Sequence, residues 1–183
     1  SIICSPLPVN GIESTAAGKA TADSLFWYPT HSYTAGSGDL GYTTGPWTFH
    51  SADKKSEVYG SFLSVWRKQP DSTWRVVLDC GVSHPKFATP PVGLKAPAAT
   101  AMTVASSSAS AADAAAAGSW KDPVASAEER FTAAAARGPG TAVSKFAAPD
   151  VRVMVAGSLP AVGVQAAEKL ITAQKLGATW QHV

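Results

Sequence analysis

The segment 37–81 has the hydrophobic pattern of a β-sheet. Runs rich in β-branched and aromatic residues recur at 40–44, 58–66 and 74–79. Turn-forming sequence precedes each run: a Gly-Asp pair at 38–39, a polar stretch at 50–57, and Gln-Pro-Asp-Ser at 69–72. Proline fixes φ at the second turn position, and Asp and Ser side chains bond the local backbone. The segment therefore predicts three antiparallel strands.

Alternation along these runs indicates that the strands carry apolar groups on both faces. In the run 58–66, one face holds Phe62, Ser64 and Trp66, and the other holds Tyr59, Ser61, Leu63 and Val65. In 74–80, alternation assigns one face to Trp74, Val76, Leu78 and Cys80, and the other to Arg75, Val77 and Asp79. Asp79 is thus predicted to be a carboxylate in a mainly apolar strand, where it needs a partner or a shifted pKa.

The last third of the chain has mainly helical patterns. We expect helices at 122–137, 141–146 and 163–176, and a strand at 150–155. Asp122 suits the N-cap of the first helix and Pro123 its first turn. Thr141 can cap the short second helix, and Gly177 suits the C-cap of the third.

An internal repeat relates the two ends of the chain. Residues 1–31 resemble residues 153–183: Leu7 and Pro8 recur as Leu159 and Pro160, 152 positions later. A repeat this long indicates two copies of a domain. On this alignment Cys4 falls within a strand-like run, so we expect a strand position there rather than a lipidated cysteine.

Each copy is incomplete, and the two complement each other. Residues 1–86 read as the strand-rich C-terminal part of a first domain, 87–118 as an Ala/Pro/Ser-rich linker, and 119–183 as the helical N-terminal part of a second copy. The linker composition offers too little burial to offset its ordering entropy. Within one unit the order is helix, short helix, strand, helix, then antiparallel strands, which is α+β. The sequence leaves open whether the halves close within one chain or between chains.

The composition and net charge limit the classes of partner that we expect for this protein. Hydrophobic residues make up 45% of the chain, enough for a core, and the net charge is only +2. Without a Lys/Arg cluster or an apolar run near the required ~20 residues, we expect no nucleic-acid or membrane partner. Cys4 and Cys80 could pair or stay as thiols. A signal peptide is absent or already removed, and the Ala/Pro/Ser/Thr-rich linker favours a periplasmic or secreted location, with a cytoplasmic one as the alternative.

The order of elements and the amino-acid sequence of the central segment resemble those of the nuclear transport factor 2-like superfamily, above all its bacterial SnoaL-like and ketosteroid-isomerase-like branch. The similarity lies in SGDLGYTTG at 37–45, WRKQPD at 66–71, WRVVLD at 74–79, and the strand and turn at 150–163. It covers roughly 1–86 and 119–183. It implies a curved antiparallel sheet wrapped by helices into a cone, also described as a cystatin-like roll, with an open pocket and a homodimeric assembly.

The isomerases of this superfamily use an acidic base at the end of the first strand, with a Tyr and a protonated acid as oxyanion donors. The base position aligns near Val155-Ala156 in one copy and Ile3-Cys4 in the other, and neither offers a carboxylate. The Tyr position falls near Phe131. We therefore do not expect the isomerase mechanism, and the sequence leaves open whether the protein is an enzyme.

Asp79 and His31 are the remaining catalytic candidates. Asp79 could serve as a pocket base or ligand anchor, or as a structural partner of Arg75, Arg67 or the backbone. His31 could stand at a pocket mouth or on the surface, whereas His50 and His84 are expected in solvated loops. The residues that suit an apolar small-molecule site, and equally a core, are Trp27, Tyr42, Thr44, Trp47, Phe62, Ser64 and Trp66. The scattered His and Cys residues have no metal-ligand spacing, and no cofactor motif is legible.

Three functions remain on this reading. The first is a pocket domain that binds a small apolar or polyketide-like molecule without catalysis. The second is a SnoaL-like isomerase, cyclase or hydratase acting on a small apolar or polyketide-like substrate. The third is an assembly module that dimerises through its open sheet face.

Overall fold

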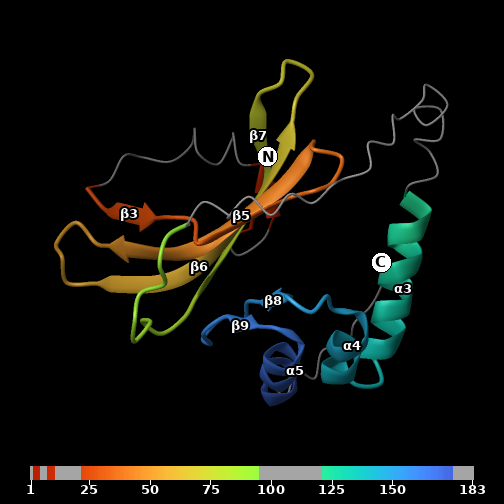
Figure 1. Cartoon of the computed structure of the whole chain (residues 1–183). Coiled ribbons are helices and arrows are strands. Elements are labelled where there is room, and N and C mark those ends of the chain that lie inside the picture. Colours follow the sequence, from red (N-terminus) through yellow and green to blue (C-terminus); the bar gives the residue numbers. More distant parts are fainter. Residues whose placement is uncertain (1, 5–7, 11–21, 95–120, 175–183) are drawn as a thin grey trace. The chain divides into compact units, whose positions relative to one another are not determined.

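The computed structural model describes residues 2–4, 8–10, 22–94 and 121–174, and these form an α+β protein (Figure 1). The chain divides into two compact units. We call Ser1–Thr103 with Met154–Leu159 the sheet unit, and Val104–Val153 with Pro160–Val183 the helical unit. The α+β class predicted from the order of elements is confirmed.

The sheet unit is built on one mostly antiparallel sheet. Its strands are β1 (Ile2–Cys4), β2 (Pro8–Asn10), β3 (Ser24–Trp27), β4 (His31–Thr34), β5 (Leu40–His50), β6 (Glu57–Lys68) and β7 (Trp74–Ser83). They lie in the order β2-β1-β7-β6-β5-β3, and β4 pairs with the same edge of β5 as β3. The parallel pair is β1 with β7, which sets Cys4 opposite Cys80.

The three central strands are confirmed, but each is longer than its predicted run. The largest extension is in β5, which continues through Gly45 and Pro46 to His50. The carbonyl of Pro46 accepts a hydrogen bond from the N–H of Tyr28. The nitrogen of Pro46 therefore faces the same edge, between β3 and β4, where a missing donor is tolerated. Gly45 is needed because a Cβ there would lie 2.1 Å from the carbonyl oxygen of Tyr28.

A β-bulge changes the predicted faces of β7. Val65 lies opposite Leu78, but the next residue, Trp66, lies opposite Val76, so Val77 has no partner of its own. An extra residue in one strand reverses the alternation beyond it. The predicted shared face of Val76 and Leu78 is therefore wrong, and Val76 joins the face of Asp79.

The predicted turn at 69–72 is confirmed. The N–H of Ser72 donates to the carbonyl of Gln69, and the N–H of Gln69 donates to the carbonyl of Thr73. The carboxylate of Asp71 accepts from both the N–H and the hydroxyl of Thr73. These local bonds explain why turn chemistry alone located the hairpin.

The helical unit contains α3 (Lys121–Ala135), α4 (Pro139–Phe146), the short strands β8 (Arg152–Val153) and β9 (Ala161–Val162), and α5 (Val164–Ala173). The three predicted helices are confirmed within a few residues at each end, but the predicted caps Asp122 and Thr141 are wrong, because both lie inside their helices and Gly138 is the N-cap of α4. Small side chains dominate its buried positions: Ala135, Ala142, Val143, Ala161, Ala167 and Ile171. Gly140 lets α4 approach α5, because a Cβ at that position would lie 2.1 Å from Oγ1 of Thr172.

Each end of the sequence repeat contains a short antiparallel hairpin, but the two pairings differ by two residues, because Ile3 aligns with Val155 whereas Ala161 pairs with Val153. β1 pairs antiparallel with β2, with Ile3 opposite Val9. β8 pairs antiparallel with β9, with Val153 opposite Ala161. Ala161 stands where the repeat predicts it, but the predicted strand at 150–155 is shorter. Cys4 occupies a strand position, as the repeat predicts.

Candidate functional site

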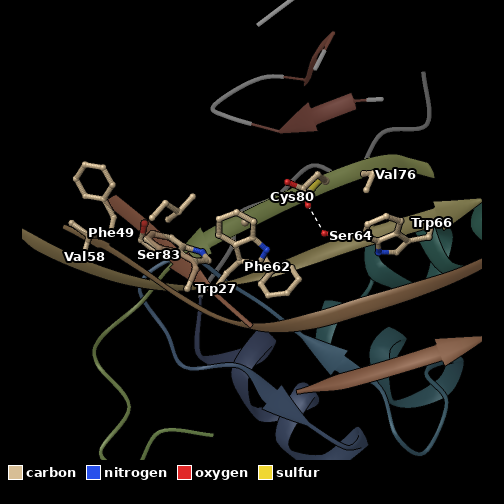
Figure 2. A pocket seen from close by; sticks show the side chains of 13 residues that line it. Trp27, Phe49, Val58, Phe62, Ser64, Trp66, Val76, Cys80 and Ser83 are labelled. Atoms are coloured by element: carbon tan, nitrogen blue, oxygen red, sulfur yellow. Dashed lines mark hydrogen bonds between the residues drawn. The ribbon is translucent and has the colours of Figure 1, made fainter. Parts of the chain in front are cut away.

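One face of the sheet unit borders a cavity of about 720 Å³ (Figure 2). We call this side the aromatic face. The cavity is lined by Leu25, Trp27, Trp47, Phe49, Val58, Phe62, Ser64, Trp66, Val76, Asp79, Cys80, Gly81 and Ser83. Four strands, β3, β5, β6 and β7, supply these residues.

Strand register explains why these residues, except Cys80, come together. Side chains directly opposite one another on paired strands point to the same side of a sheet. The rows that cross the aromatic face are Leu25–Phe49–Val58, Trp27–Trp47–Gly60–Ser83, Gly45–Phe62–Gly81, Thr43–Ser64–Asp79 and Gly41–Trp66–Val76. The polar row Thr43–Ser64–Asp79 thus lies between two rows that each carry an aromatic ring.

Trp47 lies across glycine on the neighbouring strand. A Cβ on Gly60 would come within 2.2 Å of the indole ring, and one on Gly81 would lie 3.3 Å from its Nε1. The indole N–H donates to the carbonyl of Ser61 at 3.2 Å. Glycine at position 60 therefore leaves the room that the ring occupies, and the hydrogen bond sets its orientation.

Trp66 is held in a similar way. Its indole N–H donates to the hydroxyl of Thr43 on β5 at 3.1 Å. The two indoles thus have their polar atoms engaged with the protein. What they offer a bound molecule is the faces and edges of their rings.

Asp79 is the acidic group of the cavity. The hydroxyl of Ser64 donates to its Oδ1 at 2.5 Å. Ser64 is buried and Asp79 is half-buried. The ion pairs found among the described residues join other groups, so the predicted pairing of Asp79 with Arg75 or Arg67 is not observed. Those two arginines lie opposite each other, nearer the Pro-Asp turn.

His31 is exposed and belongs to the other side of the sheet. It lies opposite Thr44 on β4 and β5, and its Nδ1 is 3.1 Å from the hydroxyl of Thr30. Asp79 shares its row with Thr43, which neighbours Thr44 and points to the opposite face. The structure therefore does not bring the two catalytic candidates together.

The candidate pocket residues divide between the two faces. Trp27, Trp47, Phe62, Ser64 and Trp66 line the cavity. Tyr42 and Thr44 lie on the opposite face, where Tyr42 stacks on Tyr33 with ring centroids 5.6 Å apart. The hydroxyl of Thr44 donates to the carbonyl of Phe62. One signal in the sequence could have found this division. If β5 is read as one strand through Pro46, alternation from Trp47 places Thr43 on the aromatic face and Tyr42 and Thr44 on the opposite face.

Other lining residues were missed by the sequence reasoning: Leu25, Phe49, Val58, Val76, Cys80, Gly81 and Ser83. Phe49 lies beyond the Gly-Pro pair that ended the predicted strand. Val76 was assigned to the wrong face because the bulge is not visible in the residue pattern.

His84 is buried, with only 6% of its surface exposed, so the expectation of a solvated loop histidine is wrong. Its Nδ1 lies 2.7 Å from the carbonyl oxygen of Pro85, and its Nε2 lies 2.9 Å from the hydroxyl oxygen of Ser61. A carbonyl only accepts, so Nδ1 carries the proton and Nε2 accepts from Ser61. With Ser61 only 3% exposed, this serine–histidine pair is structural.

A second, smaller cavity of about 280 Å³ includes charged groups around Glu57. The carboxylate of Glu57 accepts a hydrogen bond from the hydroxyl of Tyr59 and lies within ion-pair distance of Lys86 and His50. The Tyr59 hydroxyl, followed by the charges of Lys86 and His50, lowers the pKa of Glu57. Tyr59 and Glu57 raise the pKa of Lys86. Glu57 and Lys86 are exposed and His50 and Tyr59 are half-buried, and ion pairs at such a surface contribute little.

The described residues contain no group of three or more His, Cys, Asp or Glu side chains arranged to hold a metal ion. Across those same residues, no helix has the length and apolar character needed to span a membrane. No protein-family model matches the chain, and no curated protein matches it significantly. The residues of the site therefore carry the functional conclusion.

Proposed function

We propose that the aromatic face is the pocket of a small-molecule-binding domain with a cone-shaped, nuclear transport factor 2-like fold. The observation that carries the proposal is the pair of indoles, Trp47 and Trp66, each oriented by a hydrogen bond beside a cavity of about 720 Å³. The α+β element order and the mostly antiparallel sheet support the fold. The similarity of the segments 37–45, 66–71 and 74–79 to the SnoaL-like and ketosteroid-isomerase-like branch is further support for it.

The cavity has the properties of a ligand site. Small-molecule pockets typically have volumes of ~300–1,000 Å³ and combine apolar walls with a few polar groups. Trp27 is 62% exposed and Leu25 is 53% exposed beside the cavity, so the apolar surface is available to a bound molecule. Rings already oriented by the protein lose little entropy on binding, which favours affinity.

Binding is favoured over catalysis by the titratable groups in the cavity. Acid–base chemistry usually needs a proton donor and acceptor at the reacting atoms. Asp79 is the carboxylate among the described lining residues, its Oδ1 accepts from Ser64, and His31 belongs to the other face. An isomerase, cyclase or hydratase in which Asp79 acts alone as the base is the second candidate, because that carboxylate borders the cavity.

Tryptophan fluorescence tests the proposal. Titration with a panel of small ring compounds should give saturable quenching in the wild-type protein. Trp66→Ala should weaken the binding of each hit at least about tenfold, because aromatic anchors in pockets carry much of the binding free energy. Tyr33→Ala, an exposed aromatic on the opposite face, is the matched control and should leave affinity within about twofold. Equal effects of the two substitutions would contradict the proposal.

Self-association through the same surface is a further candidate function, favoured by the exposed Trp27 and Leu25. Apolar patches of this kind often mark protein contacts. Sedimentation velocity over a wide concentration range distinguishes it from ligand binding. A dimer that Trp27→Ser dissociates supports the assembly module, whereas a monomer at all concentrations rejects it.

A further inference from the structure

Asp79 has acceptor capacity that its protein contacts do not use. A carboxylate can accept about four hydrogen bonds, and the contact described for Asp79 is the single one from Ser64. The described residues that line the cavity include no Lys, Arg or His. Asp79 is thus a negative charge in an apolar cavity whose walls contribute no cation.

The row of residues that contains Asp79 lies between two rows that carry aromatic rings. Along β6, Ser64 lies two residues from Phe62 on one side and two residues from Trp66 on the other. Two residues of strand span roughly 6–7 Å, so the carboxylate row is flanked by an aromatic ring in each neighbouring row. Next to Asp79 on the same face is Gly81, which has no side chain to fill the space between the carboxylate and Trp47.

Three of the polar groups near Asp79 already have partners within the protein. The indole N–H groups of Trp47 and Trp66 donate to Ser61 and Thr43, and the hydroxyl of Ser64 donates to Asp79. A bound molecule therefore meets mainly aromatic rings and a carboxylate, and these groups share one preference. Aromatic faces attract cations through the ring quadrupole, and a carboxylate attracts them by charge.

A neutral apolar ligand would be a poorer match. It would cover Asp79 and remove water from a carboxylate without supplying a counter-charge, which is costly. An ammonium group restores the lost hydrogen bonds and neutralises the charge. The same groups disfavour an anionic ligand, because both the carboxylate and the ring faces repel it.

We propose that the cavity binds an organic cation, a protonated amine attached to an apolar ring, with the ammonium group at Asp79 between Phe62 and Trp66 and the ring against Trp47 and Trp27. This inference rests on the proposed small-molecule function and adds the chemical class of the ligand. In this arrangement Asp79, with the rings of Phe62 and Trp66, determines specificity for the cation, and Trp47 and Trp27 determine affinity for the ring.

Three matched probes test the inference by calorimetry: 2-phenylethylammonium, the neutral 2-phenylethanol, and the anionic 3-phenylpropionate. The ammonium probe should bind at least about tenfold more tightly than the alcohol, and the anion should bind most weakly. The affinity of the ammonium probe should fall as salt is raised, whereas that of the alcohol should not.

Asp79→Asn keeps the size of the side chain and removes its charge. It should reduce the affinity for the ammonium probe about tenfold and leave the alcohol within about twofold. Glu128→Gln, an exposed carboxylate on α3, changes net charge equally and should have no effect. Trp66→Leu is a second, independent variant that leaves the carboxylate intact, and it should weaken the ammonium probe more than the alcohol.

The outcomes separate the two proposals. If the alcohol binds as tightly as the ammonium probe, or if Asp79→Asn leaves the ammonium affinity unchanged, the cation inference is wrong and the small-molecule pocket stands. If none of the probes and no member of the ring panel binds, both fail. If Asp79→Asn does not fold, the Trp66→Leu comparison and the salt dependence decide.

Discussion

The two faces of the sheet are made from the same strands but treat their polar groups in different ways. On the face opposite the cavity, His84 is satisfied by Ser61 and Pro85, Thr44 donates to a backbone carbonyl, and Tyr33 stacks on Tyr42. On the aromatic face, the carboxylate of Asp79 borders open volume and is matched by one hydroxyl. The polar groups named on the opposite face have partners within the protein, whereas the carboxylate on the aromatic face can still accept hydrogen bonds from a ligand.

This difference separates stability from binding. Internally satisfied buried groups stabilise a fold because removing one partner leaves the other unpaired. A carboxylate that borders a cavity contributes little to the fold and is available to a ligand. The comparison therefore predicts that substitutions on the opposite face cost stability and that substitutions near Asp79 cost binding.

The largest effect on stability is expected at Gly60, where the absence of a side chain leaves room for the Trp47 ring. Gly60→Val forces a branched side chain into the Trp47 ring, because a Cβ alone would lie 2.2 Å from it. We expect a loss of about 3 kcal/mol in the free energy of unfolding, at the upper end for overpacking. Urea denaturation measures it. Gly36→Ala is the control, since a Cβ there meets nothing within 4 Å. Equal stabilities would show that Trp47 is not held over Gly60.

The opposite face supplies the next effect. His84→Leu leaves the buried hydroxyl of Ser61 without its acceptor and should cost about 2 kcal/mol of unfolding free energy. Ligand affinity should stay within about twofold, because the pair lies away from the cavity. Adding Ser61→Ala to His84→Leu should recover part of the loss. A His84→Leu protein that is fully stable but cannot bind ligand would break the comparison.

Asp79→Asn should have a smaller effect on stability. It retains a side chain of the same size that can still accept from Ser64, so we expect a change below about 1 kcal/mol in the free energy of unfolding. Thermal denaturation of the variant and the wild type at equal concentration measures it. A loss of several kcal/mol would mean that Asp79 holds the sheet together and that the two faces do not differ as described.

The smallest effect concerns Glu57. Its folded-state pKa is lowered, first by the Tyr59 hydroxyl and then by Lys86 and His50, so its contribution to stability is present above the unfolded-state pKa and is lost as pH falls through the folded-state pKa. The stability difference between wild type and Glu57→Gln should therefore be larger at pH 7 than at pH 3. Denaturant midpoints at the two values measure it. Because the group is exposed, a difference near the detection limit is expected.

Local chemistry explains the part of the fold that could be predicted from sequence. The turn at 69–72 was predictable because Pro70 and Asp71 act within a few residues of one another. The helices were predictable because their signals, such as Pro near the start and Gly near the end, are also local. The same signals gave the α+β class.

The candidate site was predicted in part for the same reason. Phe62, Ser64 and Trp66 lie in one uninterrupted strand, where alternation alone puts them on one face. Tyr42 was wrongly grouped with the pocket residues. The Gly45-Pro46 pair looks like the end of a strand in the sequence, whereas β5 continues through it to His50. Val76 was assigned to the wrong face because the bulge at Val77 cannot be recognised from the residue pattern.

The sequence by itself determined the central parts of three strands, the turn at 69–72 and the three helices, because those choices depend on neighbours along the chain. The tertiary structure decided what each side chain meets. Trp47 has room because Gly60 and Gly81 lie on other strands, and His84 contacts Ser61, which lies 23 positions earlier in the chain. Pairing register sets these contacts, and register depends on the whole sheet, so only the folded protein places Asp79 beside an aromatic cavity.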